Sequence, residues 1–499
     1  MIALTLAEIA EIVGGRLHAT DGSPVITGSI EFDTRKVTEG GLFLALPGER
    51  VDGHDFAAQA VAAGAAGVLA GREVDAPAVI APPVETKHAN AYVLAGDRTG
   101  EGAAVLAALA KLARHVTDSL KDLTIVGVTG SAGKTSTKDL IAQVLSPAGE
   151  TIAPPGSFNN ELGHPWTALR ATEDTRFLVL ELSARGIGHI ANLCEIAPPK
   201  FGAVLNVGTA HLSEFGSREG IAQGKGELVE SLPEDGVAIL NADDPLVAGM
   251  ASRTRAKVVL VGENPAADVR AENIELDDQA RASFTLKTAQ GDAQVKLALS
   301  GTHQVGNALV AAAIALELGA SPAEVAQRLG GAQRVSAHRM VITDRADGVT
   351  VIDDAYNANP DSVRAALKAL ATISRATASS PTPGGGPAPS RPARRSWAVL
   401  GPMAELGDDA VLAHDEIGRL AVRLDISRLV VVGDAARAMH QGAHLEGSWG
   451  DESVLVPDAD AAIALLGAEI RPGDVVLVKA SNAYRLWRIA EALLEAGTK

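Results

Sequence analysis

The sequence predicts an α/β protein of three domains, and two observations support this fold class. The chain has 499 residues, enough for three domains of about 150 residues each. Short apolar runs alternate with helical patterns through most of its length, which is typical of βαβ units around mainly parallel sheets. Because 46% of the residues are hydrophobic but only 3% are aromatic, the core is expected to consist mostly of Ala, Val, Leu and Ile.

The first predicted domain covers residues 1–98 and is a small mixed α/β unit. Its strand-like runs are LFLAL, GVLA and AVIA, and the Ala-rich stretch Asp55–Ala63 is predicted to be helical. The helical pattern EGAAVLAALAKLARHV follows, and we expect it to connect this domain to the next.

The central domain is predicted over residues 99–335 and the C-terminal domain over residues 336–499. The central strand candidates are LTIVGV, RFLVLEL, FGAVLNV, GVAIL and AKVVLVG; those of the C-terminal domain are GVTVID, SWAVLG, RLVVVG and DVVLVKA. Both read as parallel sheets, the second of a doubly wound, Rossmann-like type. A Pro-, Gly- and Ser-rich stretch at about residues 375–395 is expected to be a mobile surface loop.

Charge and composition exclude several classes of protein. The formal net charge of −17 argues against nucleic-acid binding, which calls for a basic surface. The single cysteine, Cys194, cannot form an intrachain disulfide. The N-terminus carries acidic instead of basic residues, unlike a signal peptide, and no apolar run approaches the ~18 residues of a membrane helix. We therefore expect a cytoplasmic, monomeric protein without membrane insertion, acting on small molecules.

Residues 124–140, TIVGVTGSAGKTSTKDL, predict a phosphate-binding loop between a strand and a helix. Gly130 and Gly133 allow backbone N–H groups to approach phosphate oxygens, Lys134 can reach the β- and γ-phosphates, and the Thr135 hydroxyl can bind Mg²⁺. The general motif has glycine where this chain has Val128. The expected ATP cradle is Thr129, Gly130, Ser131, Ala132, Gly133, Lys134, Thr135 and Ser136. The alternative is a Gly-rich turn with an exposed lysine.

The pattern T-G-[ST]-x-G-K-T over Thr129–Thr135 resembles the Mur ligase family of ATP-dependent amide-forming ligases, whose architecture folylpolyglutamate synthases share. Further motifs are similar to the members that join D-alanyl-D-alanine to UDP-N-acetylmuramoyl-tripeptide. They are GSFNNELGHP, NVGTAHLSEFGS, KGEL, DDAYNANPDS, GPMAELG before His414, and DTRKVTEGGLFLALPGERVDGHDF. Small departures from the family's motifs occur in His303–Asn307, Lys479–Ser481 and Glu181–Ala184. They affect the fine positioning of these residues more than the type of reaction.

The resemblance implies that ATP activates the peptide carboxylate as an acyl phosphate, which an incoming amine then attacks to give the pentapeptide precursor of peptidoglycan. Two anions meet in the first step, so cations are needed. The family's pattern assigns catalysis to Lys134, Glu181, His211, Lys225 and Arg339. It makes Thr135, Glu181, His211 and a carbamylated Lys225 the Mg²⁺ ligands. Without the phosphate loop beside it in the same sheet, Glu181 would read as a strand-end acid in solvent. The alternative for Lys225 is a lysine on a helix surface.

The resemblance also implies the ligand contacts. Asn307 would face the adenine, although it could instead cap the helix NALVAAAIALEL. Asp354 would bind the ribose, and Arg339 would reach phosphate across a gap between domains that closes on binding. The predicted substrate contacts are Ser29, Asp33, Thr34 and Arg35 for the uridine diphosphate, and Asn159, Asn160, Tyr356, Asn357 and Asn359 near the reacting groups.

Two competing interpretations remain open at the level of sequence. One is another amino-acid-adding Mur ligase or a folylpolyglutamate synthase. The other, from a different class, is a P-loop nucleotide-binding switch without ligase chemistry, which would bind nucleotide but show no turnover that depends on a peptide acceptor.

Overall fold

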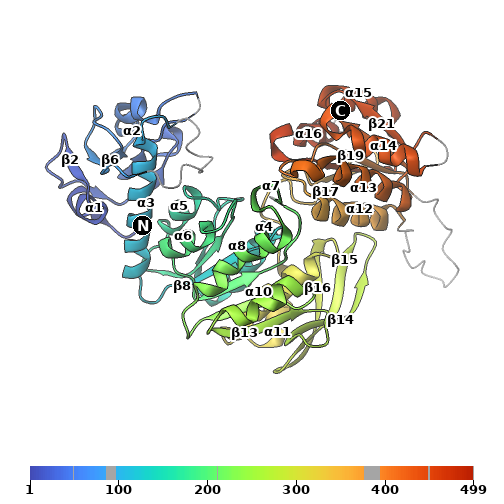
Figure 1. Ribbon diagram of the computed structural model, residues 1–499, viewed down its shortest axis with the longest axis horizontal. Coiled ribbons are helices and arrows are strands. Elements are labelled where there is room, and N and C mark those ends of the chain that lie inside the picture. Colours follow the sequence, from blue (N-terminus) through green and yellow to red (C-terminus); the bar gives the residue numbers. More distant parts are fainter. Residues whose placement is uncertain (49, 86–96, 211, 376–393, 448–449, 498–499) are drawn as a thin grey trace.

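The computed structural model describes residues 1–48, 50–85, 97–210, 212–375, 394–447 and 450–497. It has mixed α/β architecture with three larger sheets, as the sequence predicts. Figure 1 shows the sheets in chain order, with the N-terminal and C-terminal regions on either side of a central region. Most of the predicted loop at 375–395, and the predicted metal ligand His211, lie outside the described residues.

The N-terminal region is built on a five-stranded sheet in the order β2-β7-β6-β5-β4. Its strands are β2 (Arg16–His18), β4 (Ile30–Glu31), β5 (Gly41–Leu44), β6 (Ala65–Ala70) and β7 (Ala78–Ile80), all parallel except β2. A small antiparallel pair, β1 (Leu4–Thr5) and β3 (Val25–Ile26), flanks helix α1 (Leu6–Val13). The predicted helix at 55–63 is shorter, α2 (Ala57–Ala62), because residues Gly53–Phe56 form a 3₁₀ turn.

Helix α3 (Glu101–Ser119) connects the N-terminal and central regions. It packs against α1 on one side and against α5 (Gly163–Ala168) and α6 (His189–Ile196) on the other. Its buried face consists mainly of Ala, Val and Leu side chains, among them Val105, Leu109 and Leu112. The Lys111 ammonium adds a hydrogen bond to the Val13 carbonyl at 3.0 Å. The predicted helical connector is therefore present at the expected residues.

The central sheet has nine strands in the order β16-β15-β14-β13-β12-β11-β8-β10-β9. The parallel strands are β8 (Thr124–Thr129), β9 (Glu150–Ile152), β10 (Thr175–Glu181), β11 (Phe201–Val204), β12 (Val237–Asn241), β13 (Lys257–Gly262) and β14 (Val269–Leu276). Helices α4 (Lys134–Leu145) and α10 (Gln304–Glu317) pack against each other. Helix α6 packs against α8 (Arg218–Glu230), and α11 (Pro322–Gly331) packs on β16. The short helices α7 (Leu212–Phe215) and α9 (Pro245–Ala248) complete the region.

The sequence did not predict the antiparallel extension of this sheet. β15 (Arg281–Thr288) and β16 (Gly291–Ser300) pair antiparallel beside β14. Buried and partly exposed side chains alternate along β15, the pattern of a strand with only one face in the core. A search for continuous apolar runs finds strands buried on both faces and misses this kind.

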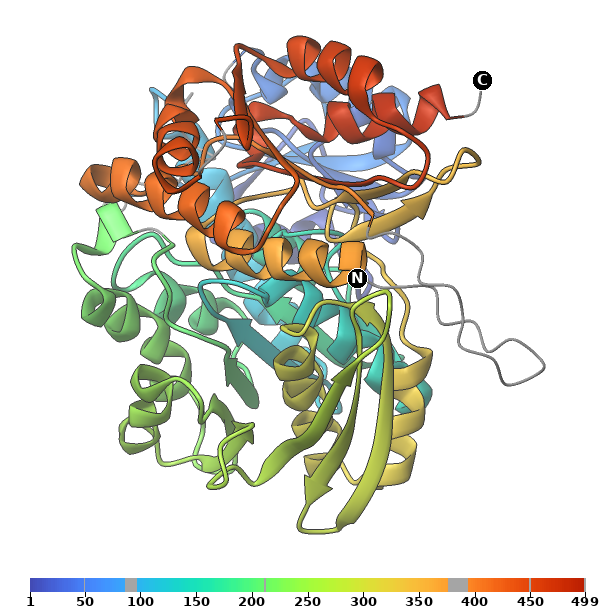
Figure 2. The same ribbon diagram turned by 90° about the vertical axis from the view of Figure 1, so that its right-hand side faces the viewer.

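The C-terminal region has a six-stranded sheet in the order β17-β18-β22-β19-β20-β21. Its strands are β17 (Val341–Asp344), β18 (Thr350–Asp353), β19 (Ser396–Leu400), β20 (Arg428–Val432), β21 (Ser453–Val456) and β22 (Val475–Lys479), all parallel except β17. Its helices are α12 (Pro360–Arg375), α13 (Ala410–Arg423), α14 (Arg437–Glu446), α15 (Ala459–Glu469) and α16 (Trp487–Ala496). Both views place α12 on the side that faces the central region (Figures 1 and 2). None of the helices in the described part of the chain is long and apolar enough to span a membrane.

Candidate active site

The predicted phosphate loop lies between strand β8 and helix α4, as expected. Thr129 ends the strand and donates its hydroxyl to the Leu182 carbonyl at 2.9 Å. Gly133 has a φ of 85°, and a Cβ atom there would come within 2.9 Å of the Asn307 side-chain oxygen, so only glycine fits. Val128 is fully buried and pairs with β10 and β11. The glycine of the general motif is thus replaced by a core residue of the strand.

The Lys134 side chain folds back over the loop at the start of α4. Its ammonium donates to the Gly130 carbonyl at 2.8 Å. Desolvation lowers the pKa of Lys134 and the nearby Arg339 lowers it further, while the carboxylates of Glu181 and Glu405 act in the opposite direction. The lysine is thus held among charged groups from both the central and the C-terminal regions, and the interpretation as an exposed lysine in a Gly-rich turn is wrong.

A buried polar cluster surrounds Glu181 at the carboxyl end of β10. Glu181 is only 2% exposed; it accepts from the Thr135 hydroxyl at 2.9 Å and from the Asn159 amide at 2.7 Å. The Ser157 and Thr135 hydroxyl oxygens lie 2.7 Å apart. Buried oxygens of this kind are the ligands that Mg²⁺ prefers. Glu181 is therefore not an acid in solvent, and the cluster can hold a cation.

Lys225 lies on α8 and is 2% exposed. Its pKa lies well below the ordinary lysine value, chiefly because burial disfavours the charged form and also because Lys134 is near. A helix-surface lysine would be exposed, so that alternative is wrong. A lowered pKa increases the share of the neutral amine, the form that is nucleophilic.

Arg339 extends from the C-terminal region into the central cluster. Its guanidinium donates to the Thr135 hydroxyl at 3.1 Å and to the Ser157 hydroxyl at 3.2 Å. The same group stacks on Tyr356, with its carbon 4.1 Å from the ring centroid. Its Nε is buried without a hydrogen-bond partner in the described part of the chain. Buried donors normally have partners, so this nitrogen is available to a ligand.

A cavity of about 390 Å³ adjoins this cluster. It is lined by Ala132, Gly133, Thr135 and Ser136 of the loop, by Asn307, and by Arg339 and Asp354 of the C-terminal region, among others. Asn307 lies inside the first turn of α10, donates to the Gln304 side-chain oxygen at 2.9 Å, and is not the N-cap, a position that His303 occupies. The alternative that Asn307 caps this helix is therefore wrong.

The paired aspartates Asp353 and Asp354 have different environments. Asp354 lines the cavity, accepts from the Met340 amide at 3.0 Å and pairs with the Lys479 ammonium at 2.6 Å. Asp353 pairs with His338 at 2.6 Å and does not line the cavity. The geometry agrees with the expectation that Asp354 is the ligand-facing member.

Several predicted substrate residues use their side chains within the protein. Asn160 accepts from the Gly163 amide at 2.9 Å in the first turn of α5. Asn359 donates to the Ser131 carbonyl at 3.3 Å and accepts from the Ser362 amide at 2.9 Å. It thereby joins the start of α12 to the phosphate loop. Asn357 is exposed, and its side-chain oxygen accepts from the next amide, that of Ala358, at 2.9 Å.

The predicted uridine-diphosphate residues lie apart from the cavity, in the N-terminal region. The Asp33 carboxylate pairs with the Arg35 guanidinium at 2.8 Å. Hydrogen bonds from the side chain and the backbone of Arg35 lower the pKa of Asp33 to about 2. The Ser29 hydroxyl accepts from that of Thr38 at 3.0 Å. Thr34 is half-buried and begins the 3₁₀ turn Thr34–Lys36, which Asp33 precedes as the N-cap.

An aromatic cluster joins this segment to the central region. The Phe32 ring centroid lies 6.3 Å from that of Phe158 and 6.1 Å from that of Trp166, and the Trp166 indole donates to the Ile30 carbonyl at 2.7 Å. Phe158 immediately precedes Asn159, which bonds Glu181. The packing therefore connects the predicted uridine site to the buried cluster through one loop.

The sequence reasoning missed three residues of the site. Ser157 bonds Thr135 and Arg339. Asn206 exchanges two hydrogen bonds with the backbone of Ala132, at 2.9 and 3.1 Å. Lys479 neutralises Asp354. All three lie inside motifs quoted above, so their place in a motif was the signal that could have identified them. Their partners come from other parts of the chain, which the motifs do not reveal.

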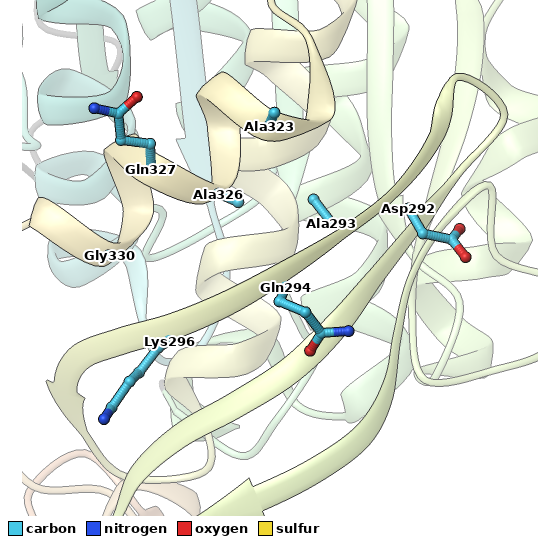
Figure 3. A pocket seen from close by; sticks show the side chains of 8 residues that line it. All are labelled: Asp292, Ala293, Gln294, Lys296, Ala323, Ala326, Gln327 and Gly330. Atoms are coloured by element: carbon cyan, nitrogen blue, oxygen red, sulfur yellow. The ribbon is translucent and has the colours of Figure 1, made fainter.

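A second hollow, of about 460 Å³, lies between β16 and α11 (Figure 3). Its lining is mainly small or neutral, including Ala293, Ala323 and Ala326. Its carboxylate, Asp292, pairs with Lys287. None of the predicted site residues lines it, so we place the chemistry at the cavity beside the phosphate loop.

Comparison with known proteins agrees with this geometry. Family models match residues 128–315 (Mur ligase middle domain), 387–482 (Mur ligase, glutamate ligase domain) and 27–117 (Mur ligase family, catalytic domain). The chain belongs to the Mur ligase family. This Mur ligase is 58% identical, over 100% of its length and 99% of the relative's, to the UDP-N-acetylmuramoyl-tripeptide–D-alanyl-D-alanine ligase of Mycobacterium tuberculosis H37Rv. It is 33% identical to that of Escherichia coli K12, over the whole of both chains.

Solved structures give the same result for the fold. MurF from Acinetobacter baumannii matches with a TM-score of 0.80 at 30% identity, over 99% of both chains. MurF ligase from Thermotoga maritima in complex with ADP matches with a TM-score of 0.75 at 27% identity, over 95% of this chain and 98% of the other. The fold class and the ligase family predicted from the motifs are confirmed.

Proposed function

We propose that this Mur ligase joins D-alanyl-D-alanine to UDP-N-acetylmuramoyl-tripeptide in an ATP-dependent reaction with an acyl-phosphate intermediate. Its relatives of that name match over essentially the full length of the chain. The observation that carries the proposal is the meeting of Lys134, Glu181 and Arg339 at the edge of the cavity. We place the reaction in the cytoplasm and expect the protein to act as a monomer.

The cavity fits ATP in size and chemistry. Its volume of about 390 Å³ lies in the usual range for small-molecule sites, about 300–1,000 Å³. Asn307 offers the amide that can read the adenine edge, and Asp354 offers a carboxylate for the ribose hydroxyls. The loop from Thr129 to Ser136 supplies backbone N–H groups at the start of α4, where anions bind favourably.

The cluster around Glu181 fits Mg²⁺, which would neutralise charge on the phosphates. Glu181 and Thr135 would be its ligands, and Asn159 and Ser157 would orient them. Buried Lys225 would contribute after reacting with CO₂: its neutral nitrogen forms a bond to the carbon and loses one proton, which leaves an anionic carbamate. Active enzyme in which mass spectrometry finds only unmodified Lys225 would contradict this role. His211, as a further ligand, stays a prediction.

The chain's cations then allow two anions to approach each other. Lys134 and Arg339 face the same cluster from the central and C-terminal sides, and positive charge there lowers the repulsion between the peptide carboxylate and the γ-phosphate. The segment containing Ser29, Asp33, Thr34 and Arg35 would hold the uridine diphosphate, with the peptide extending past Phe158 towards Glu181. Tyr356, Asn357 and Asn359 are the proposed contacts on the dipeptide side.

The test is phosphate release from ATP and Mg²⁺ with UDP-N-acetylmuramoyl-tripeptide, with and without D-alanyl-D-alanine, alongside single amino acids. We expect release that requires the dipeptide, and a pentapeptide product. Preference for a free amino acid would favour another Mur ligase. Release with glutamate and a folate acceptor would favour a folylpolyglutamate synthase, and nucleotide binding without release with any acceptor would favour the switch.

A further inference from the structure

The linker, residues 332–340, joins α11 of the central region to β17 of the C-terminal region and runs along helix α4. Linker residues spaced three apart bond helix residues spaced four apart, and the pairs are Gln333 with Gln143, Ser336 with Asp139, and Arg339 with Thr135. Positions four apart lie on one face of a helix. The linker therefore follows this face, antiparallel to α4, and its last contact is the one at the phosphate loop.

The middle contact belongs to a buried charged network. The Ser336 hydroxyl donates to one oxygen of the Asp139 carboxylate at 2.6 Å, and the Lys138 ammonium donates to the other oxygen. The same ammonium donates to the Pro154 carbonyl at 2.7 Å. Ser336, Asp139 and Lys138 are all buried, and none of these three side chains lines the cavity beside the phosphate loop. A role in the reaction would therefore be exerted through neighbouring residues.

The buried pair of Lys138 and Asp139 holds the two segments that meet at the site. Pro154 lies three residues before Ser157, and Ser336 lies three residues before Arg339. The Arg339 guanidinium donates to the Ser157 hydroxyl at 3.2 Å. The pair thus fixes both segments one helical turn, about 5.4 Å, from the point where Arg339 enters the cluster.

The C-terminal region fixes the chain on both sides of Arg339. The Met340 amide donates to the Asp354 carboxylate at 3.0 Å. His338 and Met340 have φ values of 56° and 55°, in the left-handed region that is unfavourable for residues with a side chain. Such conformations persist only where the surroundings hold them. Ala337 alone separates His338 from the part of the linker that is bonded to α4, so the position of that bond passes to Arg339 with little slack.

We propose that Asp139 is a positioning residue of the reaction: through Ser336 it sets the place from which Arg339 reaches the phosphates of bound ATP. The inference rests on the proposed function, in which Arg339 contacts phosphate. The Arg339 Nε is buried without a hydrogen-bond partner among the residues that the structure describes, and is the donor left for that contact. Hydrogen bonds weaken steeply when their geometry changes, so a displaced linker removes this contact while the cavity itself stays intact.

The affinity for a non-hydrolysable ATP analogue with Mg²⁺, measured by calorimetry, tests the proposal in a cycle of variants. Ser336→Ala removes the hydroxyl but leaves the buried pair intact, whereas a change of Asp139 would leave a buried ammonium unpaired and endanger the fold. We expect Ser336→Ala to weaken binding by about 5-fold or more, and Arg339→Ala by about 10- to 100-fold. When Arg339→Ala is already present, Ser336→Ala should change the affinity by less than about 2-fold, because the first change has removed the group through which the second acts. An equal loss in both backgrounds, or no loss on Ser336→Ala alone, would overturn the inference.

Steady-state kinetics separate positioning of Arg339 from a general loosening of the linker. Ser336→Ala should lower kcat by about 10-fold or more, since a displacement of about 1 Å can cost 100-fold in rate. The KM for the UDP-tripeptide should stay within about 2-fold, because its proposed contacts lie in the N-terminal region. Gln143→Ala is the matched control: it removes both hydrogen bonds to Gln333 on the same linker, two helical turns from the site, and should change kcat and nucleotide affinity by less than about 2-fold.

A loss in Gln143→Ala as large as that in Ser336→Ala would contradict a specific role of Asp139. The binding measurements need no acceptor, so they decide the inference whatever the second substrate is. Failure of the wild type to use the dipeptide would overturn the proposed function alone.

Discussion

The buried cluster in the central region and the exposed segment in the N-terminal region are both proposed to bind anions, but their polar side chains differ in burial and in how they are bonded. Thr135, Glu181 and Lys225 are each at most 3% exposed, and Thr135 and Glu181 are bonded to each other before any ligand arrives. In the N-terminal segment the Arg35 side chain is 86% exposed and pairs with its neighbour Asp33. The polar groups of the proposed reaction site are thus bonded and buried in advance, whereas those of the proposed uridine-diphosphate site lie at the surface.

Lys134→Ala should have the largest effect and tests the preorganised side. Removal of the ammonium leaves the phosphates and the peptide carboxylate without their central cation, and we expect kcat to fall by about 1,000-fold or more. Phosphate release measures this, and circular dichroism should show an unchanged fold. Lys121→Ala, at an exposed position shortly before β8, is the control. Substantial ligase activity in Lys134→Ala would remove the phosphate-loop assignment.

Arg339→Lys should reduce kcat by about 10- to 100-fold, because a lysine keeps the charge but loses the planar group that bonds two hydroxyls and stacks on Tyr356. This change shows whether the C-terminal region belongs functionally to the preorganised side. The control is Arg364→Lys, which alters a surface pair with Glu416. Equal activities of the two variants would mean that Arg339 only closes the interface.

Closure of the domains also stays a prediction. Arg339 and Asn359 already bond the phosphate-loop region from the C-terminal side, so any closing motion starts from regions that are in contact. Small-angle scattering with and without an ATP analogue and UDP-tripeptide measures it. Superimposable profiles would show that no closure occurs.

Lys225→Met should lose activity but gain stability when CO₂ is absent, because burial disfavours the charged form of the amine and so opposes folding. The pKa of Lys225 is lower in the folded protein than in the unfolded chain, so folding releases a proton. The resulting loss of stability is largest below the folded pKa and fades as the pH rises towards the unfolded value of about 10.4. Urea denaturation of both proteins should therefore differ more at pH 7 than at pH 10. A constant difference would show that Lys225 titrates normally.

Arg35→Ala should have the smallest effect and tests the exposed side. The pair with Asp33 lies at the surface, where ion pairs contribute little to stability. We therefore expect an unchanged melting temperature, an unchanged kcat, and a KM for the UDP-tripeptide raised by about 3- to 10-fold through the loss of one phosphate contact. Arg16→Ala, which removes another surface pair of the N-terminal region, with Glu73, serves as the control. A fall in kcat with an unchanged KM would contradict a purely binding role.

The sequence predicted those parts of the site that depend on local pattern. The phosphate loop needs only a strand, a glycine turn and a helix in succession, and Glu181 could be assigned because it ends an apolar strand of the same sheet as that loop. The predicted asparagines could not be separated by role in this way. Asn159 and Asn160 are adjacent, yet one bonds Glu181 while the other accepts from an amide in the first turn of α5. That difference depends on which direction each side chain takes in the folded loop.

The sequence by itself determined the α/β class, the strand–loop–helix order around Lys134 and the family, because these follow from periodicity and from motifs within short stretches. Only the tertiary structure decided that Arg339 meets Thr135 across 204 positions of chain and that Lys225 is buried. Burial and charge environment come from the packing of distant elements, and packing changes the pKa and the available partners of a side chain without leaving a trace in its neighbouring residues.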